Sequence, residues 1–305
     1  MKVAVFSGGV GGARFVQGVV GVLPPDDVTV VGNVGDDLEV LGLSVSPDLD
    51  SIMYALAGLN DEERGWGRAG ETWRVLESVA ALGGETWFRL GDLDLGVHLL
   101  RTQALHAGEP LSSVTARLCT ALGVHTRLLP ATDDRLRTWI ATADGELTFQ
   151  EWFVARGHRD DVDGVRFEGD AAPAPGVLDA IADADLLLVA PSNPYVSIWP
   201  ILAVPAIRDA LAARRAPCVS VSPLIGGRAV RGPADRMLAR LAGGTRPKHV
   251  AGCYTGLIDA IVVDEADASD VDDLAGVRPI VARTLMVDAD ARRRLAEAVL
   301  GAVPA

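Results

Sequence analysis

The chain has few cysteines, and their placement excludes the structures that cysteine usually supports. Among 305 residues only Cys119, Cys218 and Cys253 are cysteine, and no C-x-x-C or H-x-x-x-H pattern accompanies them. Because they are odd in number, far apart and without ligand spacing, they support neither a disulfide framework nor a zinc site. We therefore expect buried free thiols.

Long apolar runs and basic stripes are also lacking. No apolar stretch reaches the ~18 residues of a transmembrane helix, and the apolar run at 3–6 is too short for the core of a signal peptide. The net charge is −13, and Lys and Arg form no stripe interleaved with aromatic residues. We expect a cytoplasmic protein that takes small-molecule substrates and has no nucleic-acid or membrane partner. Anionic ligands would need a local cradle of backbone N–H groups, cations or metal.

What the chain does have is a 49 % hydrophobic composition, enough for a sizeable core, and an alternation of strand and helix patterns. Strands are predicted at 2–6, 28–31, 186–190, 218–221, 260–263 and 280–286, and helices at 13–23, 51–59, 71–82, 95–107, 112–122, 206–213, 234–241 and 292–300. This alternation predicts an α/β fold: a three-layer, Rossmann-like, mostly parallel sheet with helices on both faces.

One stretch has a different pattern. Residues 136–142 and 146–152 flank Ala143-Asp144-Gly145, and an Asp-Gly pair between alternating strands predicts a hairpin. A polar, proline-containing stretch follows at 160–175. We therefore predict a single α/β domain over 1–305, with an inserted β-meander at 131–176.

A glycine-rich segment separates the first predicted strand from the first helix. Residues 7–14 read Ser-Gly-Gly-Val-Gly-Gly-Ala-Arg, and glycine lets backbone N–H groups approach a phosphate at a helix N-terminus. A tight turn without a ligand is the alternative. The Walker pattern is absent because Ala13-Arg14 stand where Lys-Ser/Thr should, and the last glycine of a dinucleotide motif is missing. The predicted phosphate-binding residues are Gly8, Gly9, Gly11 and Gly12.

Three polar segments carry candidate chemistry in the first half. Asn33 follows the second strand and could meet a phosphate ester or base, and the Asp36-Asp37 pair after it could hold a hard cation. Asp48 and Asp50 straddle the start of a helix, where one could bind metal or position an attacking hydroxyl. Asx turns and helix capping are the alternatives for these aspartates. In the third segment, 89–94, Arg89 and Asp92 are candidate ligand contacts.

Two further segments follow strands of the second half. Ser192, Asn193 and Ser197 come after the strand at 186–190 and could bind phosphate or ribose oxygens. Residues 222–227 follow the next strand and end in Gly226-Gly227. Each could be a plain turn, but parallel strands present such turns at one edge of the sheet. We therefore predict a shared nucleotide cleft.

Together these motifs resemble the 2-phospho-L-lactate transferase family of coenzyme F420 biosynthesis, in its bacterial branch. The matching segments run in order along nearly the whole chain: 7–12, 46–50, 90–94, 191–194, 222–227 with 232–234, and 284–286. The resemblance implies that the ribityl hydroxyl of the deazaflavin Fo attacks the diphosphate of a guanylyl donor, lactyl- or enolpyruvyl-diphosphoguanosine. GMP leaves and a phosphodiester, (dehydro) coenzyme F420-0, forms. Mg²⁺ is the implied cofactor and a homodimer the implied assembly.

The resemblance also implies residue roles. Asp50 and Arg89 would contact Fo, Asp50 would orient the hydroxyl or bind metal, and the segment 8–12, Asn193 and Gly226-Gly227 would contact the donor nucleotide.

The residue patterns and the resemblance together give the predicted site. Asp50 and Asp48 are the predicted catalytic residues, Asp50, Arg89 and Asp92 the predicted contacts of Fo, and Asp50 and Asp37 the predicted metal ligands. The predicted nucleotide- and phosphate-binding residues are Gly8, Gly9, Gly11, Gly12, Asn33, Ser192, Asn193, Ser197, Gly226 and Gly227.

A related family of nucleotide-sugar-binding regulators of gluconeogenesis shares the glycine segment and offers an alternative function without catalysis. Such a regulator would not need Asp50 beside the reacting group, and we expect the segment 46–51 in the transferase rather than in the regulator. A generic nucleotidyltransferase that turns over free GTP is a third possibility.

Overall fold

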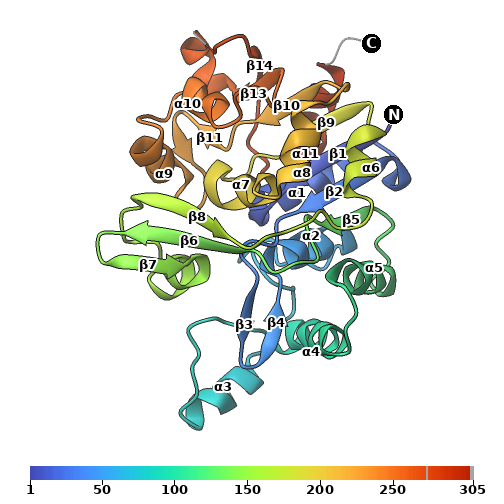
Figure 1. Ribbon diagram of the computed structural model, residues 1–305, viewed down its shortest axis with the longest axis vertical. Coiled ribbons are helices and arrows are strands. Elements are labelled where there is room, and N and C mark those ends of the chain that lie inside the picture. Colours follow the sequence, from blue (N-terminus) through green and yellow to red (C-terminus); the bar gives the residue numbers. More distant parts are fainter. Residues whose placement is uncertain (273, 303–305) are drawn as a thin grey trace.

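A computed structural model of the chain describes residues 1–272 and 274–302. Within that range, seven parallel strands form the main sheet in the order β14-β13-β10-β9-β1-β2-β5 (Figure 1). Their bounds are β1 Val3–Ser7, β2 Val28–Gly32, β5 Arg127–Pro130, β9 Leu186–Val189, β10 Cys218–Val221, β13 Ala260–Asp264 and β14 Arg278–Ala282.

Helices cover both faces of this sheet, as the alternation of patterns predicts. Val3 and Val5 of β1 pack into one hydrophobic cluster, whereas Ala4 and Phe6 pack into another, because successive side chains of a strand point to opposite faces. The first cluster also contains side chains of five helices: α1 Gly9–Val20, α2 Pro47–Ala57, α4 Asp92–His106, α5 Leu111–Ala121 and α11 Ala289–Gly301. The second contains α6 Val177–Ala182, α7 Trp199–Leu202, α8 Pro205–Ala212, α9 Ala234–Leu241 and α10 Pro247–Gly252. The three-layer α/β prediction is confirmed.

The predicted insertion contains an antiparallel meander. Strands β6 (Arg137–Thr142), β7 (Gly145–Thr148) and β8 (Gly164–Glu168) pair in the order β7-β6-β8 and lie within 131–176. The prediction of a strand at 146–152 is wrong at its end, because the chain turns into a π-helix at Glu151–Ala155 and buries Trp152 in the core. The polar stretch at 160–175 also contains β8, which the sequence did not indicate.

Several helices begin earlier than predicted. Helix α1 starts at Gly9 instead of residue 13, α2 at Pro47 instead of residue 51, and α4 at Asp92 instead of residue 95. Glycine and proline weaken the sequence signal for a helix, although proline is well suited to a first turn. As a result, Asp48 and Asp50 lie inside the first turn of α2 rather than in the loop before it.

Other differences concern strands. The predicted strand 280–286 ends at Ala282, and the amide and hydroxyl of Thr284 donate to Asp264 Oδ2 instead of pairing in the sheet. The sequence pattern did not indicate β5, the antiparallel hairpin of β3 (Leu38–Val40) with β4 (Leu43–Val45), or the small pair of β11 (Leu224–Ile225) with β12 (Arg228–Ala229). These strands are short and carry little period-two pattern.

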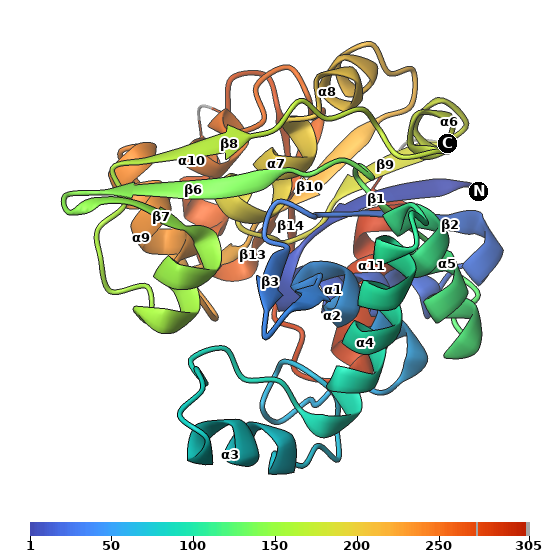
Figure 2. The same ribbon diagram turned by 60° about the horizontal axis from the view of Figure 1, so that its bottom comes forward.

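The strand order reverses at β1, in the middle of the sheet, which makes this position a topological switch point. From β1 the chain adds β2 and then β5 on one side, and later adds β9, β10, β13 and β14 on the other. Ligands of open α/β sheets bind outside the carboxyl ends of the strands at such a point. Helix α3 (Arg74–Ala81), between α2 and α4, lies at the end of the molecule away from the sheet in both views (Figure 2).

In the described range no single helix is long and apolar enough to cross a membrane. One pair, Pro194–Leu202 with Pro205–Ala212, meets the requirement of length and composition only when taken together, and it bends by 91°.

Candidate active site

A cavity of about 580 Å³ opens at the carboxyl ends of the central strands. Its walls come from the segments that follow β1, β2, β9 and β10, from the first turns of α1 and α2, and from the insertion. Of the residues singled out in the sequence, those that line it are Gly8, Gly9, Gly11, Asp36, Asp48, Asp50, Arg89, Ser192, Asn193 and Ser197. The segments predicted to share one cleft therefore meet there.

The glycine segment allows close packing around the first turn of α1. A Cβ at Gly8 would lie 2.6 Å from Asp48 Oδ2 and 2.9 Å from Ser197 Cβ, so only glycine fits. Ser192 ties the segment to the loop after β9 by donating from Oγ to Gly8 O at 2.7 Å. Gly12 lies against the hydroxyls of Ser7 and Ser192 and does not line the cavity. The glycine segment thus allows the carboxylate of Asp48 to lie close to the first turn of α1 at the cavity wall.

Asn33 positions that carboxylate from outside the cavity lining. Its buried amide donates from Nδ2 to Asp48 Oδ2 at 2.9 Å and to Val196 O at 3.2 Å, and its Oδ1 accepts from Gly35 N at 2.8 Å. Burial raises the pKa of Asp48 to about 6, although the hydrogen bond from Asn33 opposes the shift. The side chain of Asn33 is therefore committed to Asp48 and the backbone.

The acidic pair after β2 divides between two environments. Asp36 lines the cavity, and burial followed by the charge of Asp48 raises its pKa. Its Oδ1 is buried and has no hydrogen-bond partner within residues 1–272 and 274–302. Asp37 does not line the cavity; it accepts a hydrogen bond from Ser46 Oγ at 2.6 Å, and burial raises its pKa to about 7. Only one member of the pair can reach a ligand in the cavity.

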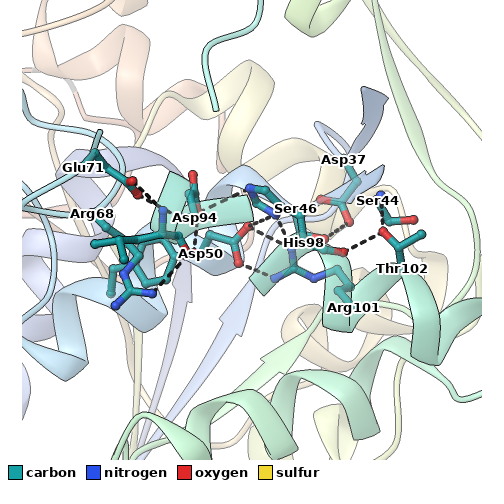
Figure 3. Close-up of polar contacts among 12 residues, drawn as sticks. Asp37, Ser44, Ser46, Asp50, Arg68, Glu71, Asp94, His98, Arg101 and Thr102 are labelled. Atoms are coloured by element: carbon teal, nitrogen blue, oxygen red, sulfur yellow. Dashed lines mark hydrogen bonds and ion pairs between the residues drawn. The ribbon is translucent and has the colours of Figure 1, made fainter. Parts of the chain in front are cut away.

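Asp50 forms a buried ion pair that the sequence analysis missed (Figure 3). Arg101 Nη1 donates to Asp50 Oδ2 at 3.0 Å, and Arg101 Nη2 donates to Asp50 Oδ1. The Arg101 side chain is only 1 % exposed and that of Asp50 only 6 %. A two-pronged guanidinium–carboxylate pair fixes both position and orientation. Arg101 therefore fixes the direction in which Asp50 faces the cavity.

A second carboxylate, Asp94, continues this network on α4. Tyr54 donates its hydroxyl to Asp94 Oδ1, and His98 Nε2 lies 3.3 Å from the same oxygen. Arg101 Nη1 lies 3.2 Å from His98 Nδ1, and because arginine can only donate, Nδ1 is the acceptor. With Nδ1 as the acceptor, a ring proton lies on Nε2, the nitrogen nearer Asp94. Asp94, His98 and Tyr54 also line the cavity.

Arg89 and Asp92, the two predicted contacts from 89–94, lie in different places. Arg89 lines the cavity and its guanidinium stacks 4.2 Å from the centre of the Trp73 ring. Asp92 is not part of the lining, and its carboxylate accepts from the backbone N–H groups of Arg74 and Val75 and from Thr72 Oγ1. Asp92 therefore caps α3, and its predicted contact with Fo has no support from the cavity geometry.

The loops of the second half contribute unequally. Ser192, Asn193 and Ser197 line the cavity, and Asn193 Oδ1 also accepts from Tyr195 N at 3.0 Å. Gly226 and Gly227 do not line it. Their N–H groups both donate, at 2.9 Å, to the carboxylate of Asp267. The N–H donors predicted to bind nucleotide are thus already occupied by a side chain of the same protein.

The insertion and the segment between α2 and α4 supply aromatic walls that the sequence analysis also missed. Phe149 and Phe153 stack with ring centres 5.1 Å apart, and both line the cavity. Trp66, Trp87 and Phe88 also line it. The scattered aromatic residues gave no periodic signal, but their ring faces suit a planar heteroaromatic ligand.

The described part of the chain contains no group of three or more His, Cys, Asp or Glu side chains arranged to hold a metal ion. A Mg²⁺ site does not require one, because Mg²⁺ commonly binds through one or two carboxylates plus substrate phosphates and water. Asp36 and Asp48 fit that description: both are buried in the cavity wall, and their charges repel each other. Asp50 is held by Arg101, and Asp37 lies outside the lining.

The fold and the cavity define an α/β enzyme with carboxylates, arginines and a glycine-led helix at the carboxyl edge of its sheet. Comparison with known proteins identifies the group within that class. The family model for 2-phospho-L-lactate transferase CofD matches residues 3–301, so the chain belongs to this family and is a transferase.

Similar proteins cover the chain almost completely. Phosphoenolpyruvate transferase of Streptomyces griseus is 45 % identical over 98 % of this chain and 98 % of its own, and that of Streptomyces coelicolor is 46 % identical over 98 % and 97 %. Among solved structures, a UPF0052 family protein of Bacillus halodurans aligns over 98 % of this chain and 99 % of its own, with a TM-score of 0.64 and 19 % identity. That likeness supports the fold alone.

Proposed function

We propose that this transferase moves a phosphoenolpyruvyl or phospholactyl group from a guanylyl diphosphate donor to the ribityl hydroxyl of Fo, in coenzyme F420 biosynthesis. The acceptor oxygen forms a bond to the phosphorus that carries the acid, the bond from that phosphorus to the oxygen of GMP breaks, and GMP leaves. The observation that carries the proposal is the meeting of the glycine-led helix, Asp48, Asp50 and Arg89 in one cavity of a family member. Similarity to phosphoenolpyruvate transferases favours the phosphoenolpyruvyl donor.

The acceptor side of the cavity is best assigned to Asp50, Arg89 and the aromatic walls. Asp50 is held in one orientation by Arg101, which suits a carboxylate that must receive a hydroxyl hydrogen bond in a fixed direction. Arg89 on Trp73 and the stacked pair Phe149 and Phe153 offer flat surfaces for the ring system of Fo. Asp92, which caps α3, is left out of this assignment.

Asp48 is the better candidate for taking the proton of the attacking hydroxyl. Its pKa is raised to about 6, and a base works best when its pKa is near the working pH. Asn33 donates to Oδ2 of Asp48, and Asp48 lines the cavity. Asp50, whose two oxygens both accept from Arg101, is better suited to positioning.

Mg²⁺ belongs to the proposal, with Asp36 as its protein ligand, because Asp36 lines the cavity and its Oδ1 has no hydrogen-bond partner among the described residues. When bound, Mg²⁺ would neutralise charge on the diphosphate. This assignment departs from the predicted ligands Asp50 and Asp37, because Asp37 does not line the cavity and Asp50 is paired with Arg101. The homodimer implied by the family resemblance and the cytoplasmic location also remain proposals.

The test is incubation of the purified protein with Fo, Mg²⁺ and each candidate donor in turn, with GMP and the phosphodiester product measured by liquid chromatography and mass spectrometry. We expect GMP and product in equal amounts, and more with the enolpyruvyl donor. GMP release without product, or turnover of free GTP, would refute the proposal. Tight binding of a UDP-sugar with no response to Fo would instead support the regulator alternative.

A further inference from the structure

Two arginines stand on the cavity wall without an acidic partner. Arg14, on the second turn of α1, donates to Glu62 O at 3.3 Å, and Arg231, before α9, donates from Nη1 to Arg64 O at 3.3 Å. Both line the cavity. Neither side chain has a carboxylate within 4.0 Å among the described residues. Their only protein acceptors there are carbonyl oxygens, which leaves most of the N–H groups of both guanidinium groups free for a ligand.

The charge around these arginines is unbalanced. Burial, followed by the charges of Arg231 and Arg292, lowers the pKa of Arg14, and the carboxylate that opposes this effect is Glu62. Glu62 itself accepts from Arg292 Nη1 at 2.7 Å. At Arg14 the charges of Arg231 and Arg292 are thus opposed by one carboxylate, and two of these three arginines, Arg14 and Arg231, line the cavity. Like charges gathered on a cavity wall favour an anionic ligand of matching charge.

The fold keeps Arg231 in this place through a glycine. A Cβ at Gly65 would lie 1.6 Å from Arg231 Nη1. Gly65 also has a φ of +84, in a region that side chains disfavour. The guanidinium therefore lies directly over the backbone of the segment that connects α2 to α4. Arg231 and this segment both line the cavity, as Arg14 does.

We infer that Arg14 and Arg231 form an anion subsite that binds an oxyanion of the donor: the carboxylate of the transferred three-carbon acid, or an oxygen of the diphosphate. The identity of the donor rests on the proposed function, whereas the anion subsite rests on the two arginines. Two planar guanidinium groups can bind either group through paired hydrogen bonds. The glycine-led helix and the loop after β9 would then hold the remainder of the nucleotide.

The test measures binding rather than turnover. Isothermal titration is carried out with inorganic pyrophosphate, with GDP and with the complete donor, on wild type, R14Q, R231Q and the double variant. R228Q is the matched control, because Arg228 is exposed, lies near Arg231 in the sequence and does not line the cavity. Each lost charged contact should weaken binding of the donor by about tenfold or more. R228Q should weaken it by less than about twofold. R14K and R231K should recover part of the loss.

The three probes separate the two sources of the anion. If donor affinity falls while GDP affinity holds, the pair binds the carboxylate; if both fall together, it binds the diphosphate. Donor affinity in the double variant that matches R228Q overturns the inference, as does a wild type that binds none of the probes. The wild type could bind pyrophosphate and yet fail to use Fo. If the double variant then loses pyrophosphate binding, the subsite is supported while the proposed function fails. Thermal unfolding of each variant checks that the fold is retained.

Discussion

Replacing Arg101 by Met tests the buried network beneath the cavity. Arg101 and Asp50 are 1 % and 6 % exposed, so the variant leaves the Asp50 carboxylate in a site that water hardly reaches. Removing one partner of a buried ion pair costs ~3–5 kcal/mol. The matched control is Arg117→Met on α5, since the Arg117 pair with Glu109 is 53 % and 40 % exposed and should contribute less than ~1 kcal/mol.

The assay is equilibrium unfolding in urea at pH 7.5 or about that value, followed by tryptophan fluorescence, with m-values compared to confirm that the transition is of the same kind. Adding Asp50→Asn completes a double-mutant cycle, and the double variant should lose clearly less than the sum of the single variants, because neither charge is then left alone. Additive losses, or an R101M midpoint equal to that of R117M, would refute the buried pair. D50N alone leaves the buried Arg101 without its charged partner. Turnover of the D50N variant is therefore measured together with its free energy of unfolding.

Three other predictions follow from the site. Asp48→Asn should lower turnover by ~10²–10⁴-fold. Wild-type activity should fall as the pH drops below the Asp48 pKa of about 6. A wild-type rate that does not change between about pH 5 and 8 would exclude Asp48 as the base. The folded-state pKa of Asp37, about 7, lies above its unfolded value, so folded chains bind more protons between about pH 4 and 7 and stability should fall as pH rises through that window. Asp37→Asn should lose that part of the pH dependence in urea unfolding, and an unchanged slope would contradict the assignment. Gly8→Ala should abolish turnover because its Cβ would lie 2.6 Å from Asp48 Oδ2, whereas Gly96→Ala on α4, where the Cβ meets open space, should keep activity and raise stability by up to ~1 kcal/mol; equal activity of the two variants would count against the close packing at Gly8.

The sequence predicts the parts of this fold that depend on local pattern. The apolar run of β1 and the alternation of strands with helices gave the three-layer sheet, because burial on both faces leaves a clear signal. The start of α1 was misplaced because glycine is a poor helix former. The turn at Gly9 is packed against the loop after β9, and no local pattern records that contact.

At the site, the contacts that the sequence did not predict are mainly those between residues far apart in the chain. Asp50 was identified from its motif, but its partner Arg101 lies 51 positions away and was not. A signal for it existed: Asp94, His98 and Arg101 recur at helical spacing, four and then three residues apart, which places three polar side chains on one face of α4. Buried polar groups on a shared face need partners, and a carboxylate of the predicted site is a suitable partner for a buried arginine.

Composition alone could not assign the glycine pair after β11. Gly226-Gly227 has the features of an anion cradle, and it is one, but its anion is Asp267, 41 and 40 positions away. A sequence pattern describes the donors of a cradle and leaves open which acceptor they meet.

That internal carboxylate has a consequence for how substrate enters. Because Asp267 already satisfies both amides, the turn between β11 and β12 needs no ligand to complete its hydrogen bonds, and Ile225 beside it lines the cavity. A surface ordered in advance forfeits little conformational freedom when a ligand arrives. This part of the cavity wall is therefore ordered by the protein itself before any substrate arrives.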